Sequence, residues 1–402
     1  MRHGGFVAAA LSAICCLLVC WAAARAAAEK DNDDARPGLS LRIAIEGEFS
    51  VGDEIPVAFT ISNGGPRDYE YYDRNYDRSG RMDEYRLVAV DEQHQTVRDP
   101  RADWPGGMGG GLCRKATLAP GQSFTKTIAL NRWALLTRPG TCQVTGYYRP
   151  EGGPVVKAVE SMPVSVTIRP RTDGEMGACI EKLAAELTAA DDDASAGIVQ
   201  KLMYTCDARV VPAIIDEMYR DRPSSFWCTE GLLYYLPKDD AATAPLLKAA
   251  SERGLAGGMQ WILEQRGVTP DQFKPLIEAS LAPERPGCWQ EGALAAQRFC
   301  DDRFTARLIA IATDKDSKAR TQAIHALAMN RTDESVATLK KLLDEPDPPK
   351  PMGRTIRQVT TDAIRSAYSR RGNTPGRPLR KDDFPARLQQ PEPPPPKPDD
   401  ST

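Results

Sequence analysis

The chain has 402 residues, and its 52 basic and 55 acidic residues leave a formal net charge of −3. This length predicts two or three domains rather than one small core. The near balance of charges provides no general positive field for nucleic acid, so we expect no nucleic-acid partner.

The N-terminus has the order of a secretory signal peptide. Arg2 precedes an uncharged run over 6–24, and small residues follow at 26–28. A basic start, an apolar middle and a small-residue exit predict export, with cleavage after Ala26 or Ala28. We therefore assign 1–28 to a signal peptide and expect a periplasmic or extracellular protein. The alternative is an uncleaved membrane anchor, because 19 apolar residues just span a bilayer.

Residues 38–170, which follow a polar linker at 29–37, predict a β domain. Apolar residues alternate with polar ones over short segments that are separated by turn-rich stretches such as "LAPGQ" and "RPGT". The expected strands lie at 39–45, 55–61, 85–91, 123–130, 141–148 and 162–170. Short strands at this spacing, without helical periodicity, are typical of an antiparallel β-sandwich.

Two stretches of this β domain invite a functional interpretation. "WPGGMGGGLC" (104–113) is glycine-rich, but it lacks the Gly-Lys-Ser/Thr ending of a phosphate loop and a following helix, so we predict a surface loop. The polar-aromatic stretch 67–85 fits a twisted edge hairpin with exposed tyrosines. Its alternative is a contact surface for a protein or a glycan, because Tyr and Arg favour recognition. The candidate partner-binding residues are Tyr69, Tyr71, Tyr72, Arg74 and Tyr76.

From about residue 175 the pattern becomes helical and repetitive. Five segments begin at 207, 240, 269, 301 and 333, and each is followed by a second apolar-periodic segment. Their apolar pairs recur at offsets of 32, 30, 32 and 31 residues, at Ile214/Ile215, Leu246/Leu247, Leu276/Ile277, Leu308/Ile309 and Leu339. A period of this length indicates stacked helix pairs. Acidic residues at the start of the first helices are expected to cap exposed N–H groups.

These features resemble two known families. The helix pairs over 175–371, above all "DKDSKARTQAIHALA", resemble HEAT-like repeats of the short bacterial kind, which implies a superhelical solenoid with a continuous core. "VGDEIPVAFTISN", "LAPGQSF" and "RPGTCQV" resemble an immunoglobulin-like module of bacterial extracellular proteins, with Cys142 where that module carries tyrosine. The predicted fold class is therefore multidomain: an all-β immunoglobulin-like sandwich followed by an all-α HEAT-like solenoid.

Seven cysteines remain after the leader, and export makes them disulfide candidates. The expected pairs are Cys113–Cys142, Cys288–Cys300 and Cys179–Cys206, which leave Cys228 as the odd residue. The alternative is buried, unpaired cysteine, which helical repeats accommodate as a small hydrophobe.

Catalytic signals are missing from the sequence. No GxSxG or HExxH motif and no cysteine–histidine zinc pattern occurs in the mature chain, so we predict no enzyme, no metal and no cofactor. His325 fits a packing or groove position, and the acidic run 191–193 fits a solvated turn. The Pro-rich end, 372–402, predicts a disordered tail that serves as a spacer or as a Pro-motif ligand.

The sequence therefore predicts an exported, non-catalytic protein-binding or scaffolding protein of the bacterial cell envelope, with an unknown protein partner. Solenoids present long concave surfaces, and sandwiches present loops at their ends. The alternative is a protease inhibitor or an accessory subunit of an extracellular or envelope enzyme.

Overall fold

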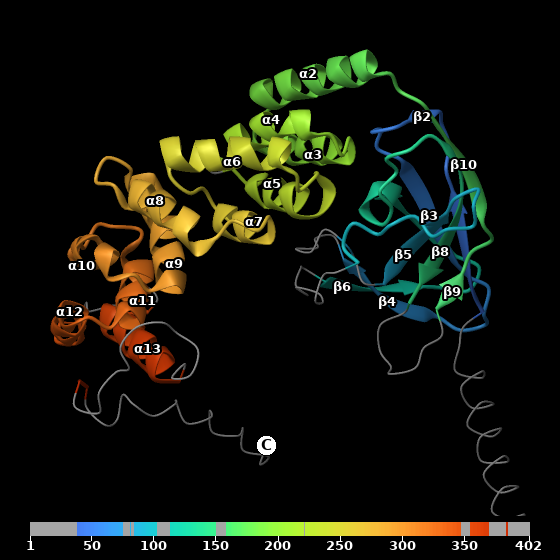
Figure 1. The fold of residues 1–402 in the computed structure, drawn as a ribbon. Helices are drawn as coiled ribbons and strands as arrows, with labels where there is room; N and C mark the ends of the chain where they lie inside the picture. Colours follow the sequence, from blue (N-terminus) through green and yellow to red (C-terminus); the bar gives the residue numbers. More distant parts are fainter. Residues whose placement is uncertain are drawn as a thin grey trace, which may run out of the picture. The chain divides into compact units, whose positions relative to one another are not determined.

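The computed structural model describes residues 38–74, 81, 84–102, 113–149, 158–220, 222–346, 354–369 and 383–384. The chain divides into two compact units, Met1–Met176 and Gly177–Thr402. The first is rich in β-strands and the second is helical (Figure 1). The expected order, a β region followed by a helical half, is confirmed. The signal peptide and the glycine-rich stretch 104–112 lie outside the described residues.

The β unit contains three small sheets. Its strands are β1 (Leu39–Ala44), β2 (Phe49–Ser50), β3 (Pro56–Asn63), β4 (Tyr69–Arg74), β5 (Tyr85–Val90), β6 (Cys113–Leu118), β7 (Ser123–Ala129), β8 (Gly140–Tyr148), β9 (Val159–Glu160) and β10 (Val164–Arg169). One sheet has the order β1-β3-β7, a second has the order β2-β10-β8-β5 with β9 beside β8, and β4 pairs with β6. All pairs are antiparallel except β10 with β2, so the second sheet is mixed and the other two are antiparallel.

The two larger sheets contribute to one hydrophobic core. Alternating residues of β3, including Val57, Phe59 and Ile61, are buried, as the period-two pattern predicts. Gly146 of β8 allows the sheets to approach closely, because a Cβ atom there would lie 2.7 Å from Ile43 and 3.0 Å from Phe59. A buried turn residue, Asn63, donates to two carbonyls and accepts the Gly65 N–H, which holds the Asn-Gly-Gly turn in place.

The helical unit contains twelve α-helices in its described residues. They are α2 (Asp173–Ala189), α3 (Asp192–Tyr204), α4 (Val211–Met218), α5 (Ser225–Glu230), α6 (Asp240–Arg253), α7 (Met259–Gln265), α8 (Pro270–Leu281), α9 (Trp289–Phe299), α10 (Thr305–Thr313), α11 (Arg320–Asn330), α12 (Asp333–Leu343) and α13 (Ile356–Ser369). A π-helical turn, η3 (Gly231–Tyr235), continues α5, and short 3₁₀ turns precede α4 and α10.

The predicted period appears in the helix caps. Side chains or capping boxes satisfy N–H groups at the starts of α4, α6, α8, α10 and α12 or of the 3₁₀ turns that lead into them. The capping residues are Asp207, Asp239, Thr269, Asp301 and Thr332. They are spaced by 32, 30, 32 and 31 residues, the same offsets as the apolar pairs. Asp191 caps α3 in the same way, so the acidic run 191–193 is a helix start.

These helices alternate in two sets. We call α4, α6, α8, α10 and α12 the first helices, and α5 with η3, α7, α9, α11 and α13 the second helices. First helices contact first helices, as in α4 with α6, α6 with α8 and α10 with α12. Second helices contact second helices, as in η3 with α7, α9 with α11 and α11 with α13. Figure 1 shows the successive pairs following one another along the unit.

Arginine side chains join neighbouring helices at their C-terminal ends. Guanidinium groups donate to the otherwise unused carbonyls at or near the last turns, where the helix dipole is negative. Arg220 and Arg222 donate to Leu187 and Ala190 at the end of α2. Further donors and acceptors are Arg266 with Leu232 and Pro237, Arg285 with Ser251 and Ala279, Arg307 with Leu281, Arg320 with Ala312, Arg331 with Ala367, and Arg357 with Leu343.

One part of the predicted tail is ordered against the helices. Asp383 and Phe384 are buried, and the Phe384 ring lies 6.5 Å from the Tyr368 ring of α13 in an edge-to-face arrangement. Lys340 of α12 lies 5.9 Å from the centre of the Phe384 ring. The expectation of a wholly disordered tail over 372–402 is therefore wrong at these two residues, because Phe384 finds apolar surface at the end of the last helix pair.

The predicted disulfide between Cys288 and Cys300 is not formed. These residues flank the 11-residue helix α9 at its two ends. A rise of about 1.5 Å per residue separates their Cα atoms by far more than the roughly 7 Å that a disulfide permits. Both thiols are free, and each donates to a nearby carbonyl, that of Arg253 or that of Gln297.

The other two predicted disulfides are also absent from the described cysteines. Cys206 has a free thiol, so it is not bonded to Cys179. Cys142 has a free thiol within the β core, and the side chain of Cys113 lies outside the described residues. Burial raises the pKa of the Cys142 thiol, and it raises that of Cys206 to about 12. Buried Cys228 fits the alternative prediction, cysteine packed as a small hydrophobe.

Replacing Gly292 by alanine tests the contact between α8 and α9. The new Cβ atom would lie 2.9 Å from the Ser280 Cβ and 3.0 Å from Leu281. We expect Gly292→Ala to lower the free energy of unfolding by about 1–3 kcal/mol, as overpacking does. The matched control, Gly197→Ala in α3, has open space around the new methyl group and should stabilise by about 0.4–1 kcal/mol. Denaturant unfolding, followed by the circular dichroism of the helices, measures the unfolding free energy of both variants. Equal changes in the two variants would contradict close packing at Gly292.

Candidate functional site

The partner-binding residues predicted in the β unit fall into two groups. Tyr69 is buried in the core, where its hydroxyl lies 3.3 Å from that of Tyr148, and burial raises the pKa of both phenols. Tyr71 stacks on Phe124, with 4.4 Å between the ring centres. Burial therefore removes Tyr69 from the predicted contact surface. The side chains of Tyr72 and Arg74 and all of Tyr76 lie outside the described residues.

A different surface carries exposed aromatic and apolar side chains. Tyr234 of η3, Trp261 of α7 and Leu294 of α9 lie on three successive second helices. Trp261 is 40% exposed and Leu294 is 38% exposed, and both are among the exposed large apolar residues of the described chain. The rings of Tyr234 and Trp261 meet edge to face, with centres 6.4 Å apart. We call Tyr234, Trp261 and Leu294 the aromatic strip.

Contacts on either side of the strip place α7 and α9 in register. At one end, the Glu291 carboxylate of α9 accepts a hydrogen bond from the backbone N–H of Gly258, the residue before α7. At the other end, the Arg298 Nε lies 2.7 Å from a Glu264 oxygen. Trp261 and Leu294 occupy the middle of this register, three residues after Gly258 and Glu291 respectively. The two side chains therefore lie at matching positions on parallel neighbours.

The π-helical turn at Gly231–Tyr235 positions the first member of the strip. π-helical turns are rare, and they occur often at functional sites because they shift side chains out of the ordinary helical register. Buried Gly231 permits the close packing of this turn, since a Cβ atom there would lie 3.0 Å from the Met203 Cβ. Tyr234 is the half-buried residue of this otherwise buried turn. Phe226, 37% exposed on α5, extends the same helix.

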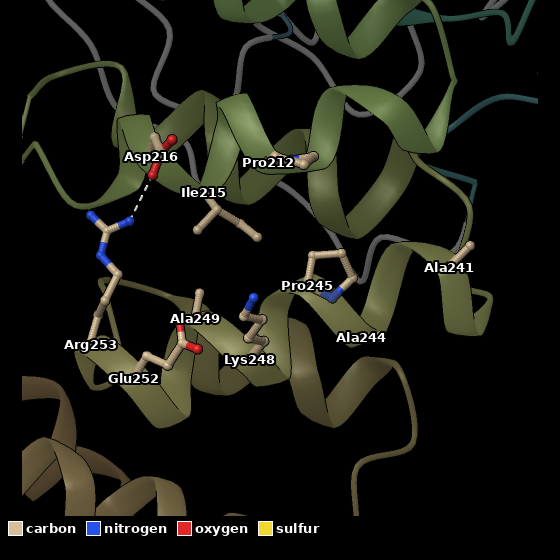
Figure 2. Close-up of a pocket in the computed structure, with 10 residues that line it drawn as sticks. All are labelled: Pro212, Ile215, Asp216, Ala241, Ala244, Pro245, Lys248, Ala249, Glu252 and Arg253. Carbon is tan, nitrogen blue, oxygen red and sulfur yellow. Dashed lines mark hydrogen bonds and ion pairs between the residues drawn. The ribbon is translucent and has the colours of Figure 1, made fainter.

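The first helices form a separate groove of about 720 Å³ between α4 and α6. Figure 2 shows its apolar floor and its charged rim. Pro212 and Ile215 lie on the α4 side, Pro245 and Ala249 lie on the α6 side, and Lys248 and Glu252 stand at the edge. A second groove of about 630 Å³ lies between α10 and α12, where Ile309 and the cap residue Thr332 contribute to its walls.

Arg253 closes one end of the α4–α6 groove. Its guanidinium lies 2.7 Å from Asp216 of α4 (Figure 2). It also lies 3.7 Å from the centre of the Tyr219 ring. The Tyr219 hydroxyl in turn donates to the carbonyl of Gly254, and burial raises the pKa of this phenol. The pair of interactions holds the last turn of α6 against the end of α4.

No three histidine, cysteine, aspartate or glutamate side chains among the described residues are grouped so as to hold a metal ion. Within the same residues, no helix is long and apolar enough to cross a membrane. The fully buried Glu217 accepts from Ser224 at 2.6 Å and pairs with Arg220 at 3.1 Å, which is a structural network at the α2–α4 junction. Half-buried His325 lies on α11.

No protein-family model matches the chain, and no curated protein matches it. The function of this protein must therefore be inferred from its own geometry.

The sequence interpretation overlooked the aromatic strip. Trp261 lies in the least regular repeat, around "GLAGGMQW", where glycines interrupt the apolar period. The helical pattern still contains a signal: Trp261 precedes the buried pair Ile262/Leu263, and Leu294 precedes Ala295/Ala296. Large apolar residues just outside the core face therefore recur at equivalent positions of α7 and α9.

Removing the charge of Glu291 tests the junction of α7 and α9. Burial raises the pKa of this carboxyl above its ordinary value of 4.5, although the Gly258 N–H opposes the shift. The folded state then retains a proton that the unfolded state releases, so its stability falls as the pH rises through this window. We expect Glu291→Gln to raise the melting temperature at pH 7, with the gain vanishing below about pH 4. If thermal unfolding showed the same rise in melting temperature at every pH, the buried charge of Glu291 would not be its cause.

Replacing Arg253 tests the closed end of the groove. Arg253→Ala removes the contact with Tyr219 and the ion pair with Asp216, and we expect a loss of about 1 kcal/mol of stability. The exposed Lys248 on the same groove wall provides the control, since Lys248→Ala should change stability by less than about 0.5 kcal/mol. Urea unfolding measures both variants, and equal losses would show that the closing contacts contribute nothing specific.

Proposed function

We propose that this chain is an exported, non-catalytic protein-binding or scaffolding protein of the bacterial cell envelope. The aromatic strip is the observation that carries the proposal. Exposed Trp and Tyr side chains are enriched where proteins bind one another, and they dominate the binding energy of such contacts. The strip lies on helices whose core faces are buried, as at Ile262 and Leu263 of α7, so its side chains stand outside the core.

The arrangement of the helices supports a HEAT-like interpretation of the second unit. Caps and apolar pairs recur at one period, and first and second helices each contact their own kind. In such stacked repeats, side chains at equivalent positions line up into continuous surfaces suited to extended partners. The alignment of Tyr234, Trp261 and Leu294 across three second helices is a surface of this type.

For the first unit we propose an immunoglobulin-like module. Two sheets contribute to one core, and their close approach at Gly146 is typical of face-to-face sheets. Loops at the ends of such modules commonly bind partners. The stretch that includes Tyr72, Arg74 and Tyr76 therefore remains a proposed second contact surface.

Partner capture tests the binding function. We expect the mature full chain, cross-linked in its own envelope extract, to recover a defined protein partner, and we expect Trp261→Ala to reduce that recovery at least tenfold, as loss of a central aromatic anchor does. Met162→Ala is the matched control, because Met162 is 83% exposed in the other unit. Quantitative mass spectrometry of the captured proteins measures the recovery. Equal recovery by the wild type and Trp261→Ala would overturn the assignment of the strip.

A further inference from the structure

The groove between the first helices α10 and α12 combines apolar and acidic side chains. Its volume is about 630 Å³, and its lining includes Ala306 and Ile309 of α10. The same lining includes three exposed acidic residues, Asp302, Asp333 and Glu334. Asp302 lies in the 3₁₀ turn before α10, and the other two lie in the first turn of α12. We call this groove the acidic groove.

Two of these carboxylates have no counter-charge. Within the described part of the chain, no hydrogen bond or ion pair engages the side chain of Asp302 or that of Glu334. The groove between α4 and α6 differs, because its lining carries two cations and two anions, namely Lys248, Arg253, Asp216 and Glu252. Unpaired carboxylates beside apolar surface create a negative potential that attracts a cation.

The two arginines that line the acidic groove are bonded to groups outside it. Arg303 donates to Asp301 at 3.1 Å and to Glu278 of α8 at 3.3 Å. Arg331 is 3% exposed, and its guanidinium donates to the carbonyl of Ala367 on α13. Neither guanidinium therefore neutralises the exposed carboxylates at the groove.

A buried amide adds a further acceptor. Asn330, the last residue of α11, lines the acidic groove and is 1% exposed. Its Oδ1 accepts no hydrogen bond from the described residues. Its Nδ2 is held only by long contacts, 3.4 Å to the Asp301 carbonyl and 3.5 Å to the Thr305 Oγ1, so the amide turns readily toward a donor. An unpaired buried acceptor is unfavourable, and a ligand N–H that reaches it removes the penalty.

These features together select a long side chain with a cationic end. Lysine and arginine have an apolar stem and a charged head that only donates hydrogen bonds. The stem matches the apolar surface of Ala306 and Ile309, and the head matches the three acceptors of Asp302, Glu334 and Asn330. A metal ion fits less well, because no three histidine, cysteine, aspartate or glutamate side chains in the described ranges are grouped to bind one.

We infer that the acidic groove binds a lysine or arginine side chain of a protein partner, as a contact separate from the aromatic strip. The inference deepens the proposed function and rests on it, because it takes the ligand to be part of a bound protein. The groove lies on first helices and the strip lies on second helices, so the two surfaces engage different segments. Complementary charge at the groove then contributes specificity and association rate, and the strip contributes apolar anchoring.

A fluorescein-labelled peptide of alternating lysine and glycine tests the groove by fluorescence anisotropy with the full chain. At low salt we expect Asp302→Asn combined with Glu334→Gln to weaken binding about tenfold, because two ion pairs are lost. The matched control is Asp240→Asn combined with Glu252→Gln, which removes the same charge from exposed positions of α6. It should change the affinity by less than about twofold. Equal weakening by the two double variants would overturn the inference, since binding would then follow net charge alone.

Two further comparisons test the shape of the site and the buried acceptor. A peptide with 2,4-diaminobutyrate in place of lysine keeps the charge but shortens the stem, and we expect it to bind the wild type several-fold more weakly. Asn330→Leu, with its melting temperature measured to confirm folding, should weaken binding of the lysine peptide about threefold. Equal affinity for the two peptides, or unchanged affinity in a folded Asn330→Leu chain, would overturn the inferred site.

The inference and the proposed function fail in different ways. If the lysine peptide binds equally to the wild type and to the chain with Asp302→Asn and Glu334→Gln, while Trp261→Ala still loses its captured partner, the groove inference is wrong and the proposed function stands. If the peptide binds at the groove but the wild type recovers no partner from the envelope extract, the cation site stands and the proposed function is wrong.

Discussion

The hydrogen bond from an arginine of one helix to a C-terminal carbonyl of another is the interaction on which the helical unit depends. The last four carbonyls of any helix lack partners inside it and carry the negative end of the dipole. Short helices have a large share of such groups. Arg220, Arg222, Arg266, Arg307 and Arg331 each donate to a carbonyl in or just after the last turn of another helix. The five-donor guanidinium suits this role better than lysine does.

The caps and the arginine–carbonyl bonds satisfy the unpaired backbone groups at opposite ends of the helices. Asp or Thr satisfies the N-terminal N–H groups locally, and arginine satisfies the C-terminal carbonyls across a helix boundary. The helix middles are then left to pack, with small residues such as Gly292 where they approach closely. Outward positions in the middle of the second helices contribute least to this framework. Trp261 and Leu294 occupy such positions, which is why large apolar side chains there call for a functional explanation.

Much of the framework follows from local patterns in the sequence. The period-two alternation of Val57, Phe59 and Ile61 predicts their burial, and the acidic residues Asp207, Asp239 and Asp301 predict the starts of the helices. These features depend on neighbours a few residues apart. The cysteines differ, because their intervals along the chain do not determine Cα separations: Cys288 and Cys300 are near in sequence but are held apart by the helix between them.

The candidate site was harder to predict than the framework, because it too depends on separations in space that the sequence does not determine. The exposure of Trp261 depends on where α9 and η3 lie beside α7, which no single repeat determines. Glycines at 254, 257 and 258 also interrupt the apolar period just before this residue. Tyr69 appeared to belong to a polar loop, although its alternation with Tyr71 in "YEYYDR" is a strand pattern that turns both rings toward the core. Phe384 is a lone apolar residue in a polar tail, and only the end of the last helix pair gives it a place to pack.

The arginine–carbonyl bonds themselves do not depend on acidity. Guanidinium groups stay charged throughout the range in which proteins work, and carbonyls do not titrate. The whole chain has only three histidines, so few of its charges change between about pH 5 and 8. These bonds between helices therefore keep the same donors and acceptors as the surroundings acidify, whatever the nearby carboxylates do.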